Sequence, residues 1–125
     1  MLNNALDRLK DIKGYMGSAI CDYKGEVLVE DIATLDTSKE DYEIIMGTFN
    51  DIFRDAHKAS RSLDLGRTEE MTIETEKSTI ITVCSGEETR AHIHLYAIFD
   101  KDGNANLGKL TLKKIVPAVL DELIA

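Results

Sequence analysis

Residues 37–62, TSKEDYEIIMGTFNDIFRDAHKASRS, form the stretch that decides the fold. At 100° per residue, its apolar side chains fall on one stripe roughly 120° wide, which is typical of an amphipathic helix. At its start, Thr37 and Glu40 have the spacing of a capping box, in which a hydroxyl and a carboxylate satisfy free backbone amides. We therefore predict a long helix whose apolar stripe needs a second layer to cover it. The stripe consists of Tyr42, Ile45, Met46, Phe49, Ile52, Phe53 and Ala56.

Strand patterns lie on both sides of this helix. Before it, residues 15–22 and 27–29 flank the turn Asp22-Tyr23-Lys24-Gly25, which predicts a β-hairpin. After it, residues 68–75, 78–84 and 91–99 predict three strands. If residue 84 lies opposite residue 92, the last two strands share one apolar face made of Ile81, Val83, Ile93, Leu95 and Ala97.

Helical patterns open and close the chain. Leu2, Ala5, Leu6, Leu9 and Ile12 recur at helical spacing and predict a short amphipathic helix that Gly14 ends. Residues 110–124 predict a closing helix, and the ring of Pro117 inside it predicts a kink near Lys113. The whole order predicts a single α+β domain of residues 1–125. In it, helices cover both faces of a five-stranded antiparallel sheet.

Composition narrows the classes of partner. The chain has 125 residues, 43% of them hydrophobic, which is enough to fill one compact domain without disulfides or a structural metal. Fifteen basic and 23 acidic residues give a formal net charge of −8, which repels phosphate backbones and anionic lipids. We therefore expect no nucleic acid and no membrane as partner. Two cysteines and no secretion signal indicate reduced thiols in a cytoplasmic protein.

Catalytic motifs are missing from the sequence. It contains no phosphate-binding loop, no dinucleotide fingerprint, no zinc-protease helix and no serine-hydrolase elbow. Asp100, Asp102 and Asn104 resemble the start of a calcium loop, but Ala105 and Thr111 stand where that loop requires Gly and Glu. We therefore predict a plain turn there, no catalytic residues and no cofactor.

One group of side chains leaves an alternative open. His92 and His94 project from the same face of a predicted strand, and Cys84 lies on the neighbouring strand. Together they have the residue types of a three-ligand metal site. The other interpretation is a half-buried strand face whose imidazoles are satisfied by hydrogen bonds. Because no fourth ligand is visible in the sequence, we predict no metal site and leave open whether these residues bind anything.

The strand after the long helix is the candidate for self-association. Residues 68–75 begin a three-strand meander, which places them at an edge of the sheet. An edge with Met71 and Ile73 on one face favours pairing with a second copy. The alternative is an edge guarded by Glu70, Glu74 and Glu76.

Two motifs resemble the roadblock family, which comprises dynein light chains and small-GTPase regulators. One is the hairpin GSAICDYKGEVLVED at residues 17–31; the other is Asn104-Ala105-Asn106-Leu107-Gly108, typical of bacterial and archaeal members. With the order of elements, the resemblance covers residues 2–123. It implies a sandwich related to profilin and longin domains, and a homodimer in which the third strands pair and the long helices lie side by side. The interface residues that we predict are Met71, Thr72, Ile73 and Phe53.

The resemblance also implies a function. Roadblock proteins bind Ras-like GTPases or serve as subunits of motor and signalling scaffolds, and in bacterial cell-polarity systems a dimer stimulates GTP hydrolysis by its partner. They are not enzymes on their own. The partner surface would lie on the long helix at Glu43, Ile44, Thr48, Asp51, Asp55 and Lys58. Two alternatives remain: a small-ligand or metal-responsive sensor that uses His92, His94 and Cys84, and a purely structural light chain.

Overall fold

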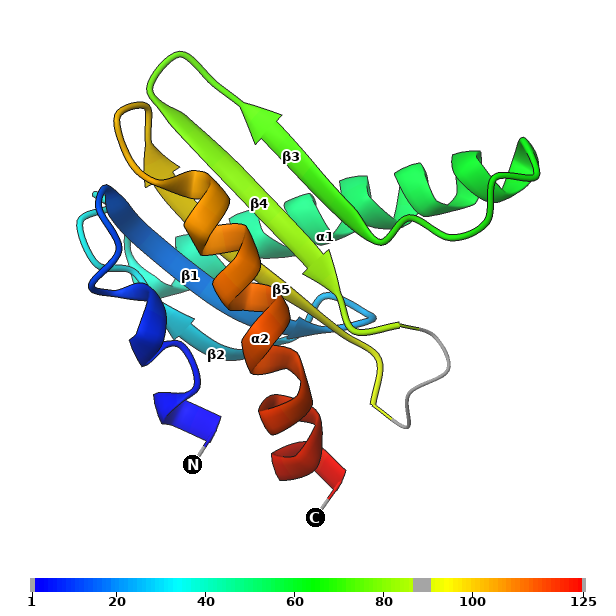
Figure 1. Cartoon of the computed structure of the whole chain (residues 1–125), viewed down its shortest axis with the longest axis horizontal. Coiled ribbons are helices and arrows are strands. Elements are labelled where there is room, and N and C mark those ends of the chain that lie inside the picture. Colours follow the sequence, from blue (N-terminus) through cyan, green and yellow to red (C-terminus); the bar gives the residue numbers. More distant parts are fainter. Residues whose placement is uncertain (1, 87–90, 125) are drawn as a thin grey trace.

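A five-stranded antiparallel sheet lies between two helical layers (Figure 1). The computed structural model of the chain describes residues 2–86 and 91–124. The spatial order of the strands is β2-β1-β5-β4-β3. Helix α1 packs on one face of the sheet and helix α2 on the other, which confirms the predicted α+β architecture. The elements are β1 (Tyr15–Asp22), β2 (Val27–Asp31), α1 (Lys39–Ser62), β3 (Glu70–Glu74), β4 (Ser78–Cys84), β5 (Ile93–Asp100) and α2 (Ala105–Ile124).

The start of the chain differs from the prediction. Instead of one α-helix it forms two 3₁₀ turns, η1 (Leu2–Asn4) and η2 (Asp7–Leu9), which share the α2 side of the sheet. A 3₁₀ turn repeats every three residues, so side chains three apart fall on one side. Leu6, Leu9 and Ile12 have this spacing and are buried in the core under α2. Spacing of three satisfies both helix types, which is why the sequence pattern was misleading.

The N-cap of helix α1 lies one residue after Thr37, the N-cap that the capping box predicts. The N-cap is Ser38, whose Oγ accepts the backbone N–H of Asp41 at 3.1 Å. The Thr37 hydroxyl instead donates to the carbonyl oxygen of Ser38. Further along the helix, the buried Tyr42 hydroxyl donates to the carbonyl oxygen of Ser18 at 2.9 Å and ties the first turn of α1 to β1.

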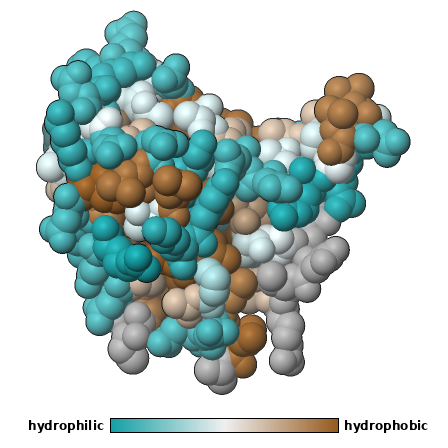
Figure 2. Space-filling model, viewed as in Figure 1, coloured by the Kyte–Doolittle hydropathy of each residue, from teal (hydrophilic) through white to brown (hydrophobic). Residues whose placement is uncertain are grey.

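The sheet covers only part of the apolar stripe on α1. The buried positions are Tyr42, Met46, Asn50 and Phe53, whereas Ile45 and Ile52 are 44% and 43% exposed. The covered side is thus rotated away from these two isoleucines and includes a polar residue. Beyond the sheet, the C-terminal end of α1 projects outward (Figure 1), and Figure 2 shows apolar side chains gathered at this end, where Leu63 and Leu65 are exposed.

The register of β4 and β5 is shifted by two residues from the predicted one. Cys84 lies opposite His94, not His92. Because side chains alternate with a period of two, a shift of two leaves every side chain on its predicted face. The five residues predicted to share an apolar face are indeed all buried in the core under α2: Ile81, Val83, Ile93, Leu95 and Ala97.

Helix α2 begins five residues earlier than predicted. The Asn104 side chain caps it by accepting the Leu107 N–H at 3.1 Å. The helix then continues through Pro117, which is exposed, so water can solvate the backbone groups that the ring leaves without a partner. The kink near Lys113 stays a prediction. Within residues 2–86 and 91–124, neither helix is long and apolar enough to cross a membrane.

Gly108 on α2 lies directly against the ring of Phe99 on β5. A Cβ atom at this position would lie 2.2 Å from Cε2 of Phe99, a ring that is fully buried. By contrast, a Cβ on Gly47 in α1 would meet only the Gly25 carbonyl oxygen, at 3.9 Å. A methyl group on Gly108 would therefore collide with the Phe99 ring, whereas a methyl group on Gly47 would make only an ordinary contact.

We expect Gly108→Ala to lower the free energy of unfolding by about 1–3 kcal/mol, because the buried Phe99 ring has no room to move. Gly47→Ala is the matched control and should raise it by about 0.5–1 kcal/mol through the helix preference of alanine. Urea unfolding of both variants measures the difference. Equal effects at the two positions would contradict the close packing of α2 on Phe99.

Candidate functional site

Strand β3 forms an open edge of the sheet, as predicted. Its hydrogen-bonding pattern follows from two bonds at its ends: Cys84 N–H donates to the Glu69 carbonyl, and Thr75 N–H donates to the Ser78 carbonyl. In an antiparallel pair, residues alternate between facing the partner strand and facing away. The backbone N–H and C=O groups of Glu70, Thr72 and Glu74 therefore point to the open edge.

Glu70 is engaged inside the chain rather than guarding the edge. Its carboxylate contacts Nζ of Lys113 at 2.5 Å and Nζ of Lys109 at 3.4 Å, both on α2. The hydrogen bond from Lys113, supported by the charge of Lys109, lowers the pKa of the Glu70 carboxyl. Of the three glutamates that the alternative interpretation assigned to guarding, Glu74 and Glu76 remain exposed.

The predicted interface residues do not all lie on the surface. Met71 and Ile73 are half-buried and Thr72 is exposed. Phe53 is 1% exposed, and its ring lies against His94 with centroids 4.7 Å apart. Its side chain belongs to the core of this chain and is not available to a partner. Ile45 and Ile52 are the exposed apolar residues of the same helix, and their place at the margin of a wide stripe was the sequence signal for them.

The six residues predicted to bind a partner all lie on α1 and form one surface. Five are exposed and Glu43 is half-buried. The most prominent apolar member is Ile44, which is 69% exposed. Five of the six are spaced by three or four residues, so they form a row along the outer side of the helix. We call this surface, made of Glu43, Ile44, Thr48, Asp51, Asp55 and Lys58, the α1 row.

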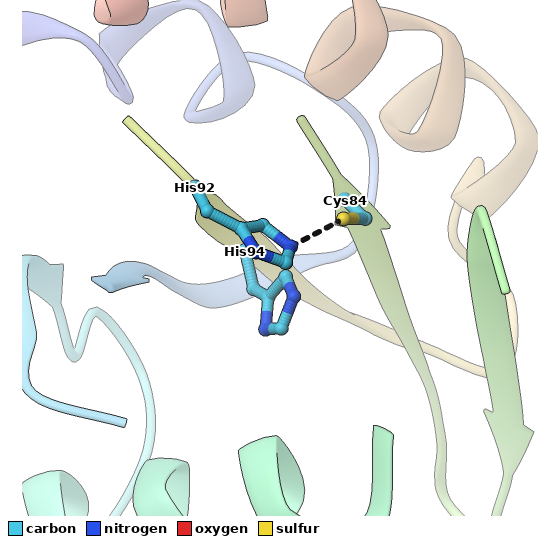
Figure 3. A group of neighbouring side chains, drawn as sticks. All are labelled: Cys84, His92 and His94. Atoms are coloured by element: carbon cyan, nitrogen blue, oxygen red, sulfur yellow. Dashed lines mark hydrogen bonds between the residues drawn. The ribbon is translucent and has the colours of Figure 1, made fainter. Parts of the chain in front are cut away.

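Cys84, His92 and His94 come together at one end of the sheet, on its α1 side (Figure 3). Sγ of Cys84 lies 3.1 Å from Nε2 of His92. The sulfur and one ring nitrogen of each histidine all lie within 4.8 Å of one another. The prediction that both histidines and the cysteine meet on one face is therefore confirmed, although the register that brings them together is different.

Asn50 fixes the orientation of His94. The Asn50 side-chain Nδ2 donates to the Tyr23 carbonyl at 3.0 Å, so its Oδ1 faces Tyr96 and His94. This oxygen accepts the Tyr96 hydroxyl at 2.8 Å and lies 2.6 Å from Nδ1 of His94. Because an amide oxygen has no proton to give, His94 must carry its proton on Nδ1, which leaves the lone pair on Nε2. Burial, together with the neighbouring His92, lowers the pKa of His94 to about 3, so the ring is neutral at pH 7.

A small cavity of about 10 Å³ adjoins the cluster. Tyr23, in the turn between β1 and β2, stacks on His92 with centroids 4.7 Å apart. The Arg54 guanidinium lies 4.5 Å from the centroid of the same Tyr23 ring. The cavity is thus enclosed by the hairpin turn, the helix and the strand ends. Its lining consists of Tyr23, Phe53, Arg54, His57, Cys84, His92 and His94, which include all three histidines of the chain.

Sequence comparisons give no relative, whereas the fold has clear counterparts. No family model and no curated protein matches the sequence. The structure is similar to a Roadblock/LC7 domain from Streptomyces avermitilis, with a TM-score of 0.81 and 11% identity over 99% of this chain and 96% of that one. It is also similar to MglB in a tetrameric arrangement, with a TM-score of 0.80 and 18% identity over 96% of this chain and 85% of that one.

Profilin shows the same layers at lower similarity. Profilin II of Acanthamoeba castellanii matches with a TM-score of 0.55 and 17% identity, over 97% of this chain and 94% of that one. The chain therefore has the roadblock/LC7 fold, within the wider profilin-like architecture. The resemblance seen in the hairpin and at the start of the closing helix is confirmed at the level of the fold.

We expect Asn50→Ala to lower the free energy of unfolding by about 2–4 kcal/mol, because the buried Tyr96 hydroxyl, the His94 N–H and the Tyr23 carbonyl all lose their partner. Asn106→Ala, at an exposed position of α2, is the control and should change it by less than about 0.5 kcal/mol. Urea unfolding followed by circular dichroism measures both. A loss at Asn50 no greater than at Asn106 would show that the amide does not tie α1 to the sheet.

Proposed function

We propose that this chain is a non-catalytic binding module that pairs with a second copy of itself and regulates or scaffolds a small Ras-like GTPase. The observation that carries the proposal is the near-complete match of the chain to a roadblock domain and to MglB. Pairing and partner binding then use two surfaces described above, the β3 edge and the α1 row.

The edge of β3 supports pairing between copies. Glu70, Thr72 and Glu74 offer backbone donors and acceptors to the open side, and a second β3 running antiparallel offers the same groups in return. Such pairing joins two sheets into one. It also brings the α1 helices of both copies to the same face, where Ile45, Ile52 and the projecting Leu63 and Leu65 gain apolar neighbours. The MglB structure with a tetrameric arrangement is consistent with a fold that self-associates.

The α1 row supports the binding of a partner with a basic patch. Its carboxylates, Glu43, Asp51 and Asp55, outnumber the single Lys58, and a net negative surface steers a positively charged partner and speeds encounter. Ile44 supplies an exposed apolar anchor at the N-terminal end of the row, next to Glu43. In this role the GTPase performs the hydrolysis, and the module acts by binding to it.

Thr72→Pro tests the pairing. Proline removes an N–H that points to the open edge and leaves the hydrogen bonds to β4 intact, as is tolerated at sheet edges. We expect light scattering to give twice 13.9 kDa for the wild type at micromolar concentration and 13.9 kDa for Thr72→Pro, with unchanged circular dichroism. Thr72→Val keeps the N–H and should remain paired. A wild-type protein that scatters as a single chain is incompatible with the proposal.

Ile44→Ala tests the partner surface. The probe is a small Ras-like GTPase, loaded with GDP or with a non-hydrolysable GTP analogue. We expect binding that depends on the nucleotide and is at least about tenfold weaker for Ile44→Ala, because the exposed apolar anchor of the row is lost. Leu110→Ala, on α2 and 47% exposed, should stay within about twofold of the wild type.

The same assay separates the possible roles of the module. Faster GTP hydrolysis on addition of the wild-type protein identifies an activator, whereas nucleotide-dependent binding without a change in rate identifies a scaffold. Equal binding to both nucleotide states, or no binding, contradicts the role proposed here.

A further inference from the structure

We propose that Cys84, His92 and His94 form a binding site for one divalent metal ion of the zinc type. The proposal goes beyond GTPase regulation, because it concerns the end of the sheet beside the β1–β2 turn and not the β3 edge or the α1 row (Figure 3). It rests on the residue types, their separations and the hydrogen bonds that orient them.

The separations fit a tetrahedral ion. Zinc bonds of about 2.3 Å to sulfur and about 2.0–2.1 Å to nitrogen place neighbouring ligand atoms about 3.3–3.6 Å apart. In this structure the Cys84 sulfur and Nε2 of His92 are 3.1 Å apart, and no two ligand atoms of the three residues are separated by more than 4.8 Å. The observed separations bracket the required ones. Movements of the ligand atoms by about 1 Å therefore bring them to tetrahedral distances.

His94 is already prepared as a ligand. Histidines that bind metal ions usually donate their second ring N–H to an oxygen, which fixes the tautomer and the ring orientation. Here Asn50 Oδ1 accepts the Nδ1–H of His94, and Asn50 is itself held by the Tyr23 carbonyl. Nε2 of His94 thus keeps a lone pair for an ion.

Water is the fourth ligand that best fits the geometry. His57 lines the same cavity, but its Nδ1 accepts the backbone N–H of Thr68 at 3.0 Å, so its proton lies on Nε2. A protonated nitrogen does not coordinate, and the cavity of about 10 Å³ has the volume of roughly one water molecule. From the described residues, the set is one sulfur and two imidazole nitrogens, with one water oxygen in the fourth position.

The donor set selects the kind of ion. Thiolate with imidazole favours zinc over magnesium and calcium, which prefer oxygen ligands. Binding converts the Cys84 thiol to a thiolate and releases one proton to solvent. The thiolate charge also offsets the Arg54 guanidinium that lines the cavity, and Asp22 adds a negative charge nearby.

The test is titration of the full chain, prepared without a histidine tag, with Zn²⁺ in the presence of a competing chelator. We expect one ion per chain with a dissociation constant below about 1 µM. In Cys84→Ser the affinity should fall at least about 100-fold, because a ligand is lost. Cys21→Ala is the control and should stay within about threefold of the wild type. Cys21 lies opposite His94 on the other neighbouring strand but does not belong to the cluster.

A second measurement on the wild-type protein avoids dependence on the folding of variants. Co²⁺ bound through a thiolate in a tetrahedral site gives a sulfur-to-cobalt charge-transfer band, and we expect this band at one equivalent of Co²⁺. Zinc binding weaker than about 1 µM, equal affinity in Cys84→Ser, or cobalt binding without the charge-transfer band would each overturn the proposal. Cys84, His92 and His94 would then be a hydrogen-bonded cluster only.

Discussion

The buried amide of Asn50 joins helix α1 to both the β1–β2 turn and strand β5. Its nitrogen bonds the turn of the β1–β2 hairpin at Tyr23, and its oxygen bonds Tyr96 and His94 on β5. Because an unpaired buried polar group costs more than a hydrogen bond contributes, this arrangement specifies one position for α1 on the sheet. The same bond determines which nitrogen of His94 carries the proton. The placement of the helix and the chemistry of the histidine therefore depend on one side chain.

The two faces of the sheet are covered to different extents. On one face, α2 and the 3₁₀ turns close the apolar core around Phe99, with no space for a methyl group on Gly108. On the other face, α1 covers the sheet with only part of its apolar stripe and extends past it. The first face provides stability. The second leaves apolar and charged side chains exposed on a helix that is fixed at its base, which is the arrangement expected of a docking surface.

The sequence predicted the elements well because hydrophobic periodicity encodes them directly. The presence of the five strands and the meeting of Cys84, His92 and His94 on one face follow from a period of two, which even a register error of two residues leaves intact. Three features depended on tertiary contacts and were missed. The spacing of Leu6, Leu9 and Ile12 fits a 3₁₀ turn as well as an α-helix. The width of the apolar stripe on α1 does not show which half of it the sheet covers. A polar residue such as Asn50 is expected on the surface unless its buried hydrogen-bond partners are known. The predicted interface therefore included Phe53, whose side chain is buried within this chain.

The ion pairs of Glu70 have a consequence for the electrostatics of the β3 edge. The strand Glu70–Glu74 carries two carboxylates, so two copies side by side would bring four negative charges together in a chain that is already strongly acidic. Lys113 and Lys109 neutralise one carboxylate of each copy from within the same molecule. The remaining repulsion comes from Glu74 alone on each strand and is short-ranged in physiological salt. Association along this edge should therefore respond only weakly to ionic strength, and what little response there is should favour the assembled form as screening increases.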